Sequence, residues 1–155
     1  MQETTSQGYV RSATSQGVTT IEFFHPASNS LPRLILTQLA ETFNSYNDDE
    51  KTKVIVLRSG GDRTFCAGAS FAELSAITNE VEGLVFFSGF ADVINAVRTC
   101  KKLVIGRVQG KCVGGGVGLA AAMDYCVART TADIKLSELA VGIGPFVVGP
   151  VIERN

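Results

Sequence analysis

Three short segments of the chain combine residue types that could do chemistry on a carbonyl group. Two are glycine-containing loops, residues 66–70 and 114–119, and the third, residues 137–139, carries Glu138 at its centre. Each loop follows a β-branched run and leads into a stretch that can form a helix. The first backbone N–H groups of a helix have no partner within it, and the helix dipole favours negative charge there. Two such N–H groups facing one another would form an oxyanion hole.

The composition predicts a globular domain that handles small molecules. With 155 residues, 45% of them hydrophobic, the chain can bury one core but is too short for two full domains. The formal net charge is −1 and the charges are interspersed, so the sequence indicates no nucleic-acid partner. Neither a signal peptide nor a membrane-spanning run is recognisable, because the apolar stretch 113–123 is short and glycine-rich. We expect a cytoplasmic protein with no membrane partner.

The cysteines indicate neither a metal site nor a disulfide framework. They are Cys66, Cys100, Cys112 and Cys126. None forms a C-x-x-C pair and no histidine cluster accompanies them, so we expect free thiols, a reducing compartment and no metal. A thiol enzyme would need a base, and the only histidine, His25, stands beside a proline where a strand is expected to end.

Hydrophobic periodicity predicts strands that alternate with helices. Strands are expected at 8–13, 18–24, 53–59, 102–109, 125–128 and 134–136, and helices at about 31–46, from 79, at 117–123 and from 146 onward. Ser30 is the expected cap of the first helix, and Asn79 with Glu82 resembles a capping box for the second. Leu31, Leu34 and Leu39 fall on one face of the first helix, while Val81, Leu84 and Val85 begin the apolar face of the second. This alternation is typical of an α/β architecture.

Several of these motifs also occur together, in the same order, in a known family. They are residues 26–31, Phe65 with the 66–69 loop, Gly110 with the glycines at 114–116, Met123-Asp124, Glu138, and residues 142–145 with Gly149. In this order and ungapped spacing the chain resembles the crotonase superfamily, the enoyl-CoA hydratase/isomerase family, over nearly its whole length. The resemblance implies an α/β crotonase-like spiral of repeated strand-strand-helix units.

The resemblance also implies a reaction and the residues that perform it. In that family a coenzyme A thioester is held with its carbonyl oxygen between two backbone N–H groups, which by motif match fall on Ala69 and Gly115. Charge that develops on this oxygen in an enolate would be stabilised by both donors. Glu138 matches one of the two glutamates that hydratases of the family use as acid and base, and is the expected proton-transfer residue.

Further expectations follow from the same resemblance. The implied thioester contacts are Cys66, Ala67, Gly68, Ser70, Phe71 and Gly114. No cofactor is implied beyond coenzyme A as part of the acyl-CoA substrate. The family continues with a C-terminal helical region that builds a trimer. We therefore expect residues 1–155 to be a catalytic core truncated before that region, from a protein that forms homo-trimers or hexamers.

The departure from the family pattern lies at Gly118. Hydratases with both carboxylates have the other glutamate at this position, so the sequence favours chemistry that one carboxylate can do, such as double-bond isomerisation, although hydration stays open. The stretch 114–119 is also similar to that of the 3-hydroxyacyl-CoA thioester hydrolase branch. The alternative to an enzyme is a non-catalytic interaction module of the same fold. Glu73 lies on an expected helix and is a candidate for a second acid. The favoured interpretation of Glu73 is a solvated residue on the helix surface.

A dinucleotide-binding reading is weaker still. Residues 116–121 fit G-x-G-x-x-A, the phosphate-binding fingerprint of that fold. The helix that the fingerprint would open is too short, because a strand is expected to begin at about Tyr125.

Overall fold

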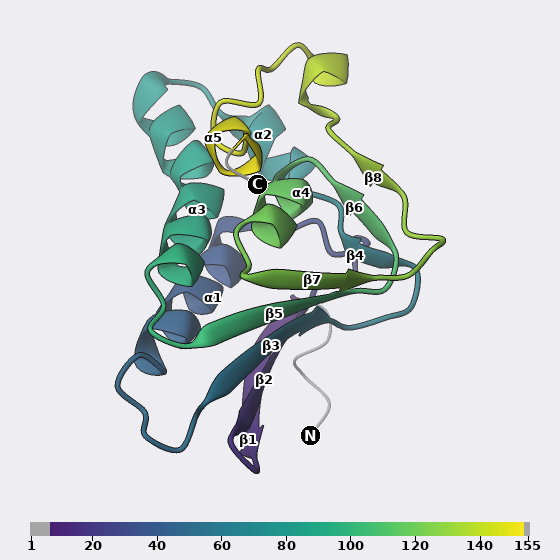
Figure 1. Ribbon diagram of the computed structural model, residues 1–155. Coiled ribbons are helices and arrows are strands. Elements are labelled where there is room, and N and C mark those ends of the chain that lie inside the picture. The colour runs from purple at the N-terminus through teal and green to yellow at the C-terminus, as the bar shows by residue number, and fades with distance from the viewer. Residues whose placement is uncertain (1–6, 154–155) are drawn as a thin grey trace.

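The computed structural model describes residues 7–153, whose strands form two sheets (Figure 1). The larger sheet has the order β1 (Tyr9–Ser15), β2 (Val18–Phe24), β3 (Val54–Ser59), β5 (Leu103–Val108) and β7 (Tyr125–Ala128). The first pair of strands is antiparallel and the others are parallel. The smaller, parallel sheet contains β4 (Thr64–Cys66), β6 (Lys111–Val113) and β8 (Ile134–Lys135).

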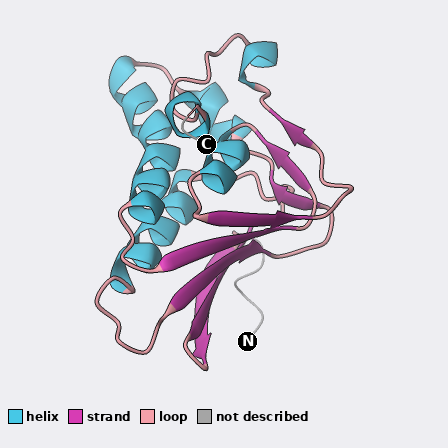
Figure 2. Ribbon diagram, viewed as in Figure 1, coloured by secondary structure: helices cyan, strands magenta, loops and turns pink. Residues whose placement is uncertain are grey.

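The helices gather on one side of the larger sheet (Figure 2). They are α1 (Arg33–Ser45), α2 (Phe71–Ala76), α3 (Glu80–Arg98), α4 (Gly115–Ala121) and α5 (Gly149–Ile152), with a 3₁₀ turn at Glu138–Val141. The α4 helix begins earlier than residue 117, and α5 later than residue 146, where the sequence pattern predicted their starts.

The chain winds as a spiral in which successive strands go to different sheets. Strands β3, β5 and β7 join the larger sheet, and the strand that follows each of them, β4, β6 or β8, joins the smaller one. Helices α2 and α3 follow the first such pair of strands and α4 follows the second. The predicted α/β spiral of strand-strand-helix units is therefore confirmed. The pattern missed β4 and β6, because three residues are too few to show an alternation.

The main core lies between the larger sheet and the helices α1 and α3. On β3, Ile55 and Leu57 are fully buried while Val54 and Val56 are only partly so. This alternation turns one face of the strand toward the helices. The two helices close the core with further buried side chains, which include Ile35, Leu36, Leu39, Phe43, Phe90, Val93 and Val97.

The α1 helix buries a slightly different face from the predicted one. Leu34 is 57% exposed, and Leu36 is buried in its place. Ser30 does not cap the helix, because its N-cap residue is Pro32. The start of α1 contains three consecutive apolar residues, Leu34, Ile35 and Leu36, so periodicity alone could not choose which of these side chains face the sheet.

The N-terminal half of α3 also departs from the prediction. Asn79 is its N-cap as predicted, since Asn79 Oδ1 accepts a hydrogen bond of 3.0 Å from the N–H of Glu82. The Glu82 carboxylate in turn accepts from the N–H of Thr78 at 2.8 Å. However, Val81, Leu84 and Val85 lie exposed rather than in the core.

Matched leucines on α1 test this corrected face. Leu39→Ala removes a fully buried side chain and is expected to lower the free energy of unfolding by about 2–5 kcal/mol. Leu34→Ala is expected to change it by less than about 0.5 kcal/mol. Urea denaturation of both variants measures the difference. Equal losses would contradict the assigned face.

Candidate functional site

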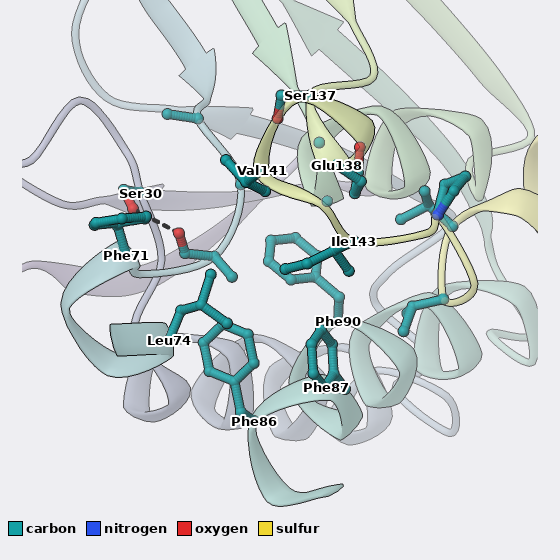
Figure 3. Close-up of a pocket in the computed structure, with 18 of the residues that line it drawn as sticks. Ser30, Phe71, Leu74, Phe86, Phe87, Phe90, Ser137, Glu138, Val141 and Ile143 are labelled. Carbon is teal, nitrogen blue, oxygen red and sulfur yellow. Dashed lines mark hydrogen bonds between the residues drawn. The ribbon is translucent and has the colours of Figure 1, made fainter. Parts of the chain in front are cut away.

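A pocket of about 240 Å³ opens where the two glycine loops, α3 and the segment after β8 meet (Figure 3). The first loop contributes Ala67, Gly68 and Ala69 to its wall, and the second contributes Gly114 and Gly115. Ser137 and Glu138 line it as well. All three segments whose sequence suggested carbonyl chemistry therefore contribute to one cavity.

The peptide that joins Gly68 to Ala69 is held in a fixed orientation. Its carbonyl, that of Gly68, accepts a hydrogen bond of 2.8 Å from the N–H of Leu31, and the N–H of Ser70 donates to the Leu31 carbonyl at 3.0 Å. In a trans peptide the N–H points opposite to the carbonyl, so the Ala69 N–H is directed away from Leu31. Among the described residues this N–H has no acceptor.

The second candidate donor is the N–H of Gly115, the first residue of α4. This position has no acceptor within its own helix, and none of the described residues supplies one. The preceding Gly114 has φ 56° and ψ −123°, a backbone conformation that is essentially restricted to glycine. Its own N–H donates to the Lys135 carbonyl at 2.9 Å, which ties the loop to the smaller sheet.

The two loops approach each other because they follow neighbouring parallel strands. Strands β4 and β6 pair at Cys66 and Cys112, and both loops emerge from the carboxyl ends of these strands. Gly68 has φ +90°, and a Cβ there would lie 3.5 Å from the Gly115 nitrogen and 3.2 Å from the Val113 carbonyl oxygen. A side chain at 68 would therefore fill the space between the loops.

Glu138 stands at the start of the 3₁₀ turn, across the pocket from the phenyl rings of α3 (Figure 3). A Cβ on Gly114 would lie 3.4 Å from Glu138 Oε1 and 3.2 Å from Ser137 Oγ, so both side chains rest against this glycine. Glu138 Oε2 is buried, and no group of the described residues donates a hydrogen bond to it. The apolar residues nearest to it in the sequence, Leu136, Leu139 and Val141, are all exposed, although Val141 also lines the pocket.

The remaining sequence-predicted contacts divide into two groups. Ala67, Gly68, Phe71 and Gly114 line the pocket. Cys66 and Ser70 do not, although they were predicted with the others.

Both of these residues have other surroundings. The Cys66 side chain is fully buried in the core, and burial raises the pKa of its thiol to about 12. Ser70 caps α2, where its hydroxyl accepts from the N–H of Glu73 at 3.3 Å. Neither residue is among those that line the pocket.

Several pocket residues were not foreseen as functional. Ser30 lines the pocket and its hydroxyl donates to the Ala69 carbonyl at 2.9 Å, so it braces the first loop. Phe86, Phe87 and Phe90 form the wall on the α3 side (Figure 3). The run of aromatic residues within α3 was a visible signal, but it could equally have belonged to the core.

Gly118, where the family pattern has a second glutamate, is a packing position in this fold. A Cβ there would lie 2.4 Å from Val148 Cγ1 and 3.2 Å from Ile94 Cδ1. Val148 and Ile94 are both buried, in a small cluster that joins α5 to α3. The space beside residue 118 is therefore filled by apolar side chains.

Two other acidic residues have structural partners. Glu73 accepts hydrogen bonds from the N–H of Arg33 at 2.9 and 3.2 Å, and so ties α2 to the start of α1. It does not line the pocket. Asp124 accepts from the N–H of Val104 at 2.7 Å, which ties the residue before β7 to β5.

Comparison with solved structures defines the class of protein. An enoyl-CoA hydratase/isomerase (crotonase) from Legionella pneumophila subsp. pneumophila superposes with a TM-score of 0.87 at 28% identity. The match covers 96% of this chain and 58% of the solved chain. The spiral described above is thus the crotonase fold.

Sequence comparison identifies the family. The sequence model of the enoyl-CoA hydratase/isomerase family matches residues 13–155, and the chain belongs to this family. It is 33% identical to human mitochondrial enoyl-CoA hydratase domain-containing protein 2, over 84% of this chain and 44% of the relative. It is 28% identical to bovine mitochondrial 3-hydroxyisobutyryl-CoA hydrolase, over 78% of this chain and 32% of the relative. The chain thus spans less than half the length of these relatives. Within residues 7–153, no helix is long and apolar enough to cross a membrane.

The backbone of Gly114 can be tested against a matched glycine. Gly114→Ala is expected to lower the free energy of unfolding by about 1–3 kcal/mol, because the new Cβ would be strained by the positive φ and would press on Ser137 and Glu138. Gly61 also has a positive φ, 83°, but a Cβ there would meet no atom within 4 Å. Gly61→Ala should therefore lose less stability. Equal losses in denaturant unfolding would show that the contacts at Gly114 carry no cost.

A double-mutant cycle tests the packing at Gly118. Gly118→Ala is expected to cost about 1–3 kcal/mol of unfolding free energy by overpacking against Val148. Combination with Val148→Ala should cost less than the sum of the two single changes, by at least about 0.5 kcal/mol, since the second change makes room for the first. Gly149→Ala, where a Cβ would meet nothing, is the control and should leave stability within about 0.5 kcal/mol. Additive effects of the first pair would contradict the contact.

Proposed function

We propose that the protein moves a double bond in acyl-CoA thioesters, with Glu138 as the only proton carrier. The observation that carries the proposal is that two residues with acceptor-free amides, Ala69 and Gly115, line the same pocket as this carboxylate. Membership of the enoyl-CoA hydratase/isomerase family supports a thioester as the ligand.

In this proposal the thioester carbonyl oxygen accepts hydrogen bonds from both amides. The Glu138 carboxylate removes a proton from C2 of a 3-enoyl thioester, and the electron pair delocalises over a dienolate whose negative charge rests largely on that oxygen. The same carboxyl group returns the proton to C4, which gives the conjugated 2-enoyl thioester. The reaction consumes no water and needs no second acid. A single preorganised donor of this kind is worth about 3–4 kcal/mol of transition-state free energy.

The packing at Gly118 favours this reaction over hydration. Addition of water across a double bond requires a base for the water and an acid for the neighbouring carbon. The position of the second carboxylate is taken by a glycine against Val148 and Ile94, so the described residues offer one pocket carboxylate only. One carboxylate is sufficient to remove and return a single proton.

Thioester hydrolysis is the second candidate, and the similarity to a 3-hydroxyisobutyryl-CoA hydrolase favours it. Glu138 would then remove a proton from a water molecule that attacks the thioester carbonyl, and the same two amides would bind the resulting oxyanion. Collapse of this oxyanion would break the carbon–sulfur bond, and the proton on Glu138 would pass to the coenzyme A thiolate, so the products would be a carboxylic acid and free coenzyme A. Release of a thiol therefore distinguishes hydrolysis from isomerisation.

Replacement of Glu138 tests the proton transfer. With a 3-enoyl-CoA substrate, Glu138→Gln is expected to lower kcat by a factor of about 10²–10⁴, because the amide cannot accept the proton. The readout is the ultraviolet absorbance of the conjugated product, measured beside a free-thiol assay. Glu73→Gln is the control, since Glu73 lies outside the pocket, and should keep full turnover.

Each outcome of this experiment decides between the candidates. Conjugated product without thiol supports isomerisation, and thiol release that depends on Glu138 supports hydrolysis. Full turnover by Glu138→Gln would remove Glu138 from the mechanism. Absence of both products in the wild type would favour a non-catalytic module.

A further inference from the structure

We propose that the pocket accepts uncharged, apolar acyl groups and rejects acyl groups that end in a carboxylate. This inference rests on the proposed function, because it assumes that a thioester carbonyl lies at the Ala69 and Gly115 amides. It concerns the part of the substrate beyond that carbonyl, to which neither the fold nor the family membership assigns a chemical class.

The α3 wall lies directly beside the second amide. A Cβ on Gly115 would be only 2.7 Å from the Phe90 ring, so this ring covers the backbone of the glycine. An acyl chain whose carbonyl is bound at Gly115 therefore starts against an aromatic face. One turn earlier on α3, Phe86 and Phe87 also line the pocket, and their rings meet edge to face with centroids 5.1 Å apart.

The opposite wall is apolar as well. Val141 and Ile143 face the rings from the segment after β8 (Figure 3), and Val147 and Val148 continue that lining. The two walls thus line the space with hydrocarbon side chains. Burial of an apolar acyl chain between them is favourable by roughly a factor of four in affinity for each methylene group.

The charges at the pocket oppose a second carboxylate. Among the described residues that line it, the only ionisable side chain is Glu138, and no lysine, arginine or histidine is present. Arg33, which reaches α3 from α1, is engaged by Asp92 at 2.8 Å and by the Val85 carbonyl at 3.2 Å. A carboxylate on the acyl chain would lose its hydration without gaining a partner, and Glu138 would repel it.

Equilibrium binding tests this selection without any need for turnover. Calorimetric titrations of the purified protein with hexanoyl-CoA, adipoyl-CoA and coenzyme A compare two acyl chains of equal carbon number, of which only the adipoyl chain has a terminal carboxylate. Hexanoyl-CoA is expected to bind at least about tenfold more tightly than coenzyme A. Adipoyl-CoA should bind at least about tenfold more weakly than hexanoyl-CoA. Equal affinities of the two thioesters would overturn the inference.

A cation introduced into the α3 wall should reverse the preference. Phe87→Arg is expected to tighten adipoyl-CoA binding and weaken hexanoyl-CoA binding, each by about tenfold. Phe146→Arg is the matched control, because Phe146 is 84% exposed and does not line the pocket, and it should change neither affinity. Should Phe87→Arg fail to fold, Val141→Lys places a cation on the opposite wall with the same expectation. A folded variant that left the preference unchanged would count against the inference.

The result separates this inference from the proposed reaction. Selective binding of hexanoyl-CoA with no conversion of a 3-enoyl thioester would overturn the reaction and support the selection. Conversion of a 3-enoyl thioester with equal binding of both acyl chains would support the reaction and overturn the selection. If neither thioester bound more tightly than coenzyme A, the inference would be wrong.

Discussion

The contact on which the rest of the site depends is the approach of two backbone loops at the ends of β4 and β6. Parallel pairing at Cys66 and Cys112 brings the loops together, and Gly68 leaves room between them, because a Cβ there would lie 3.2 Å from the Val113 carbonyl oxygen. The hydrogen bond from Leu31 to the Gly68 carbonyl then fixes the direction of the Ala69 amide. Main-chain donors placed in this way need no reorganisation when charge develops on a bound oxygen, which is the property that an oxyanion hole requires.

The spiral explains how such short strands can hold so defined a site. A three-residue strand has little stability of its own, but β4 and β6 each continue from a longer strand of the buried sheet, β3 or β5. Packing of α1 and α3 on that sheet fixes where the small sheet lies, and α3 also supplies the aromatic wall. The same elements therefore provide both stability and the pocket. At Gly118 the same packing restricts the choice of residue, because the space that a side chain there would need is filled by Val148 and Ile94.

Sequence reasoning located the parts of the site that depend on backbone and on chain order. The glycine loops are visible as glycines at expected helix starts, and the longer strands as β-branched runs. Glu138 was found from its place in the order of motifs. Sequence reasoning missed what depends on tertiary packing. The sequence pattern indicated Ser30 as a helix cap, yet its hydroxyl donates to the Ala69 carbonyl, 39 residues away in the chain. The α3 phenylalanines could not be divided between core and pocket until the position of Gly115 against Phe90 was known.

Glu138 links these observations to function. A buried acceptor without a donor costs a folded protein about 1–3 kcal/mol, so such atoms are rare where stability alone decides the residue. Oε2 of Glu138 is one of them, and it belongs to a side chain held against Gly114, next to the amide of Gly115. A local conflict of this kind is expected where a ligand supplies the missing partner. Among the described residues that line the pocket, no side chain offers this carboxylate a cationic partner, so in the proposed reaction it stays free to accept a proton from a bound acyl chain.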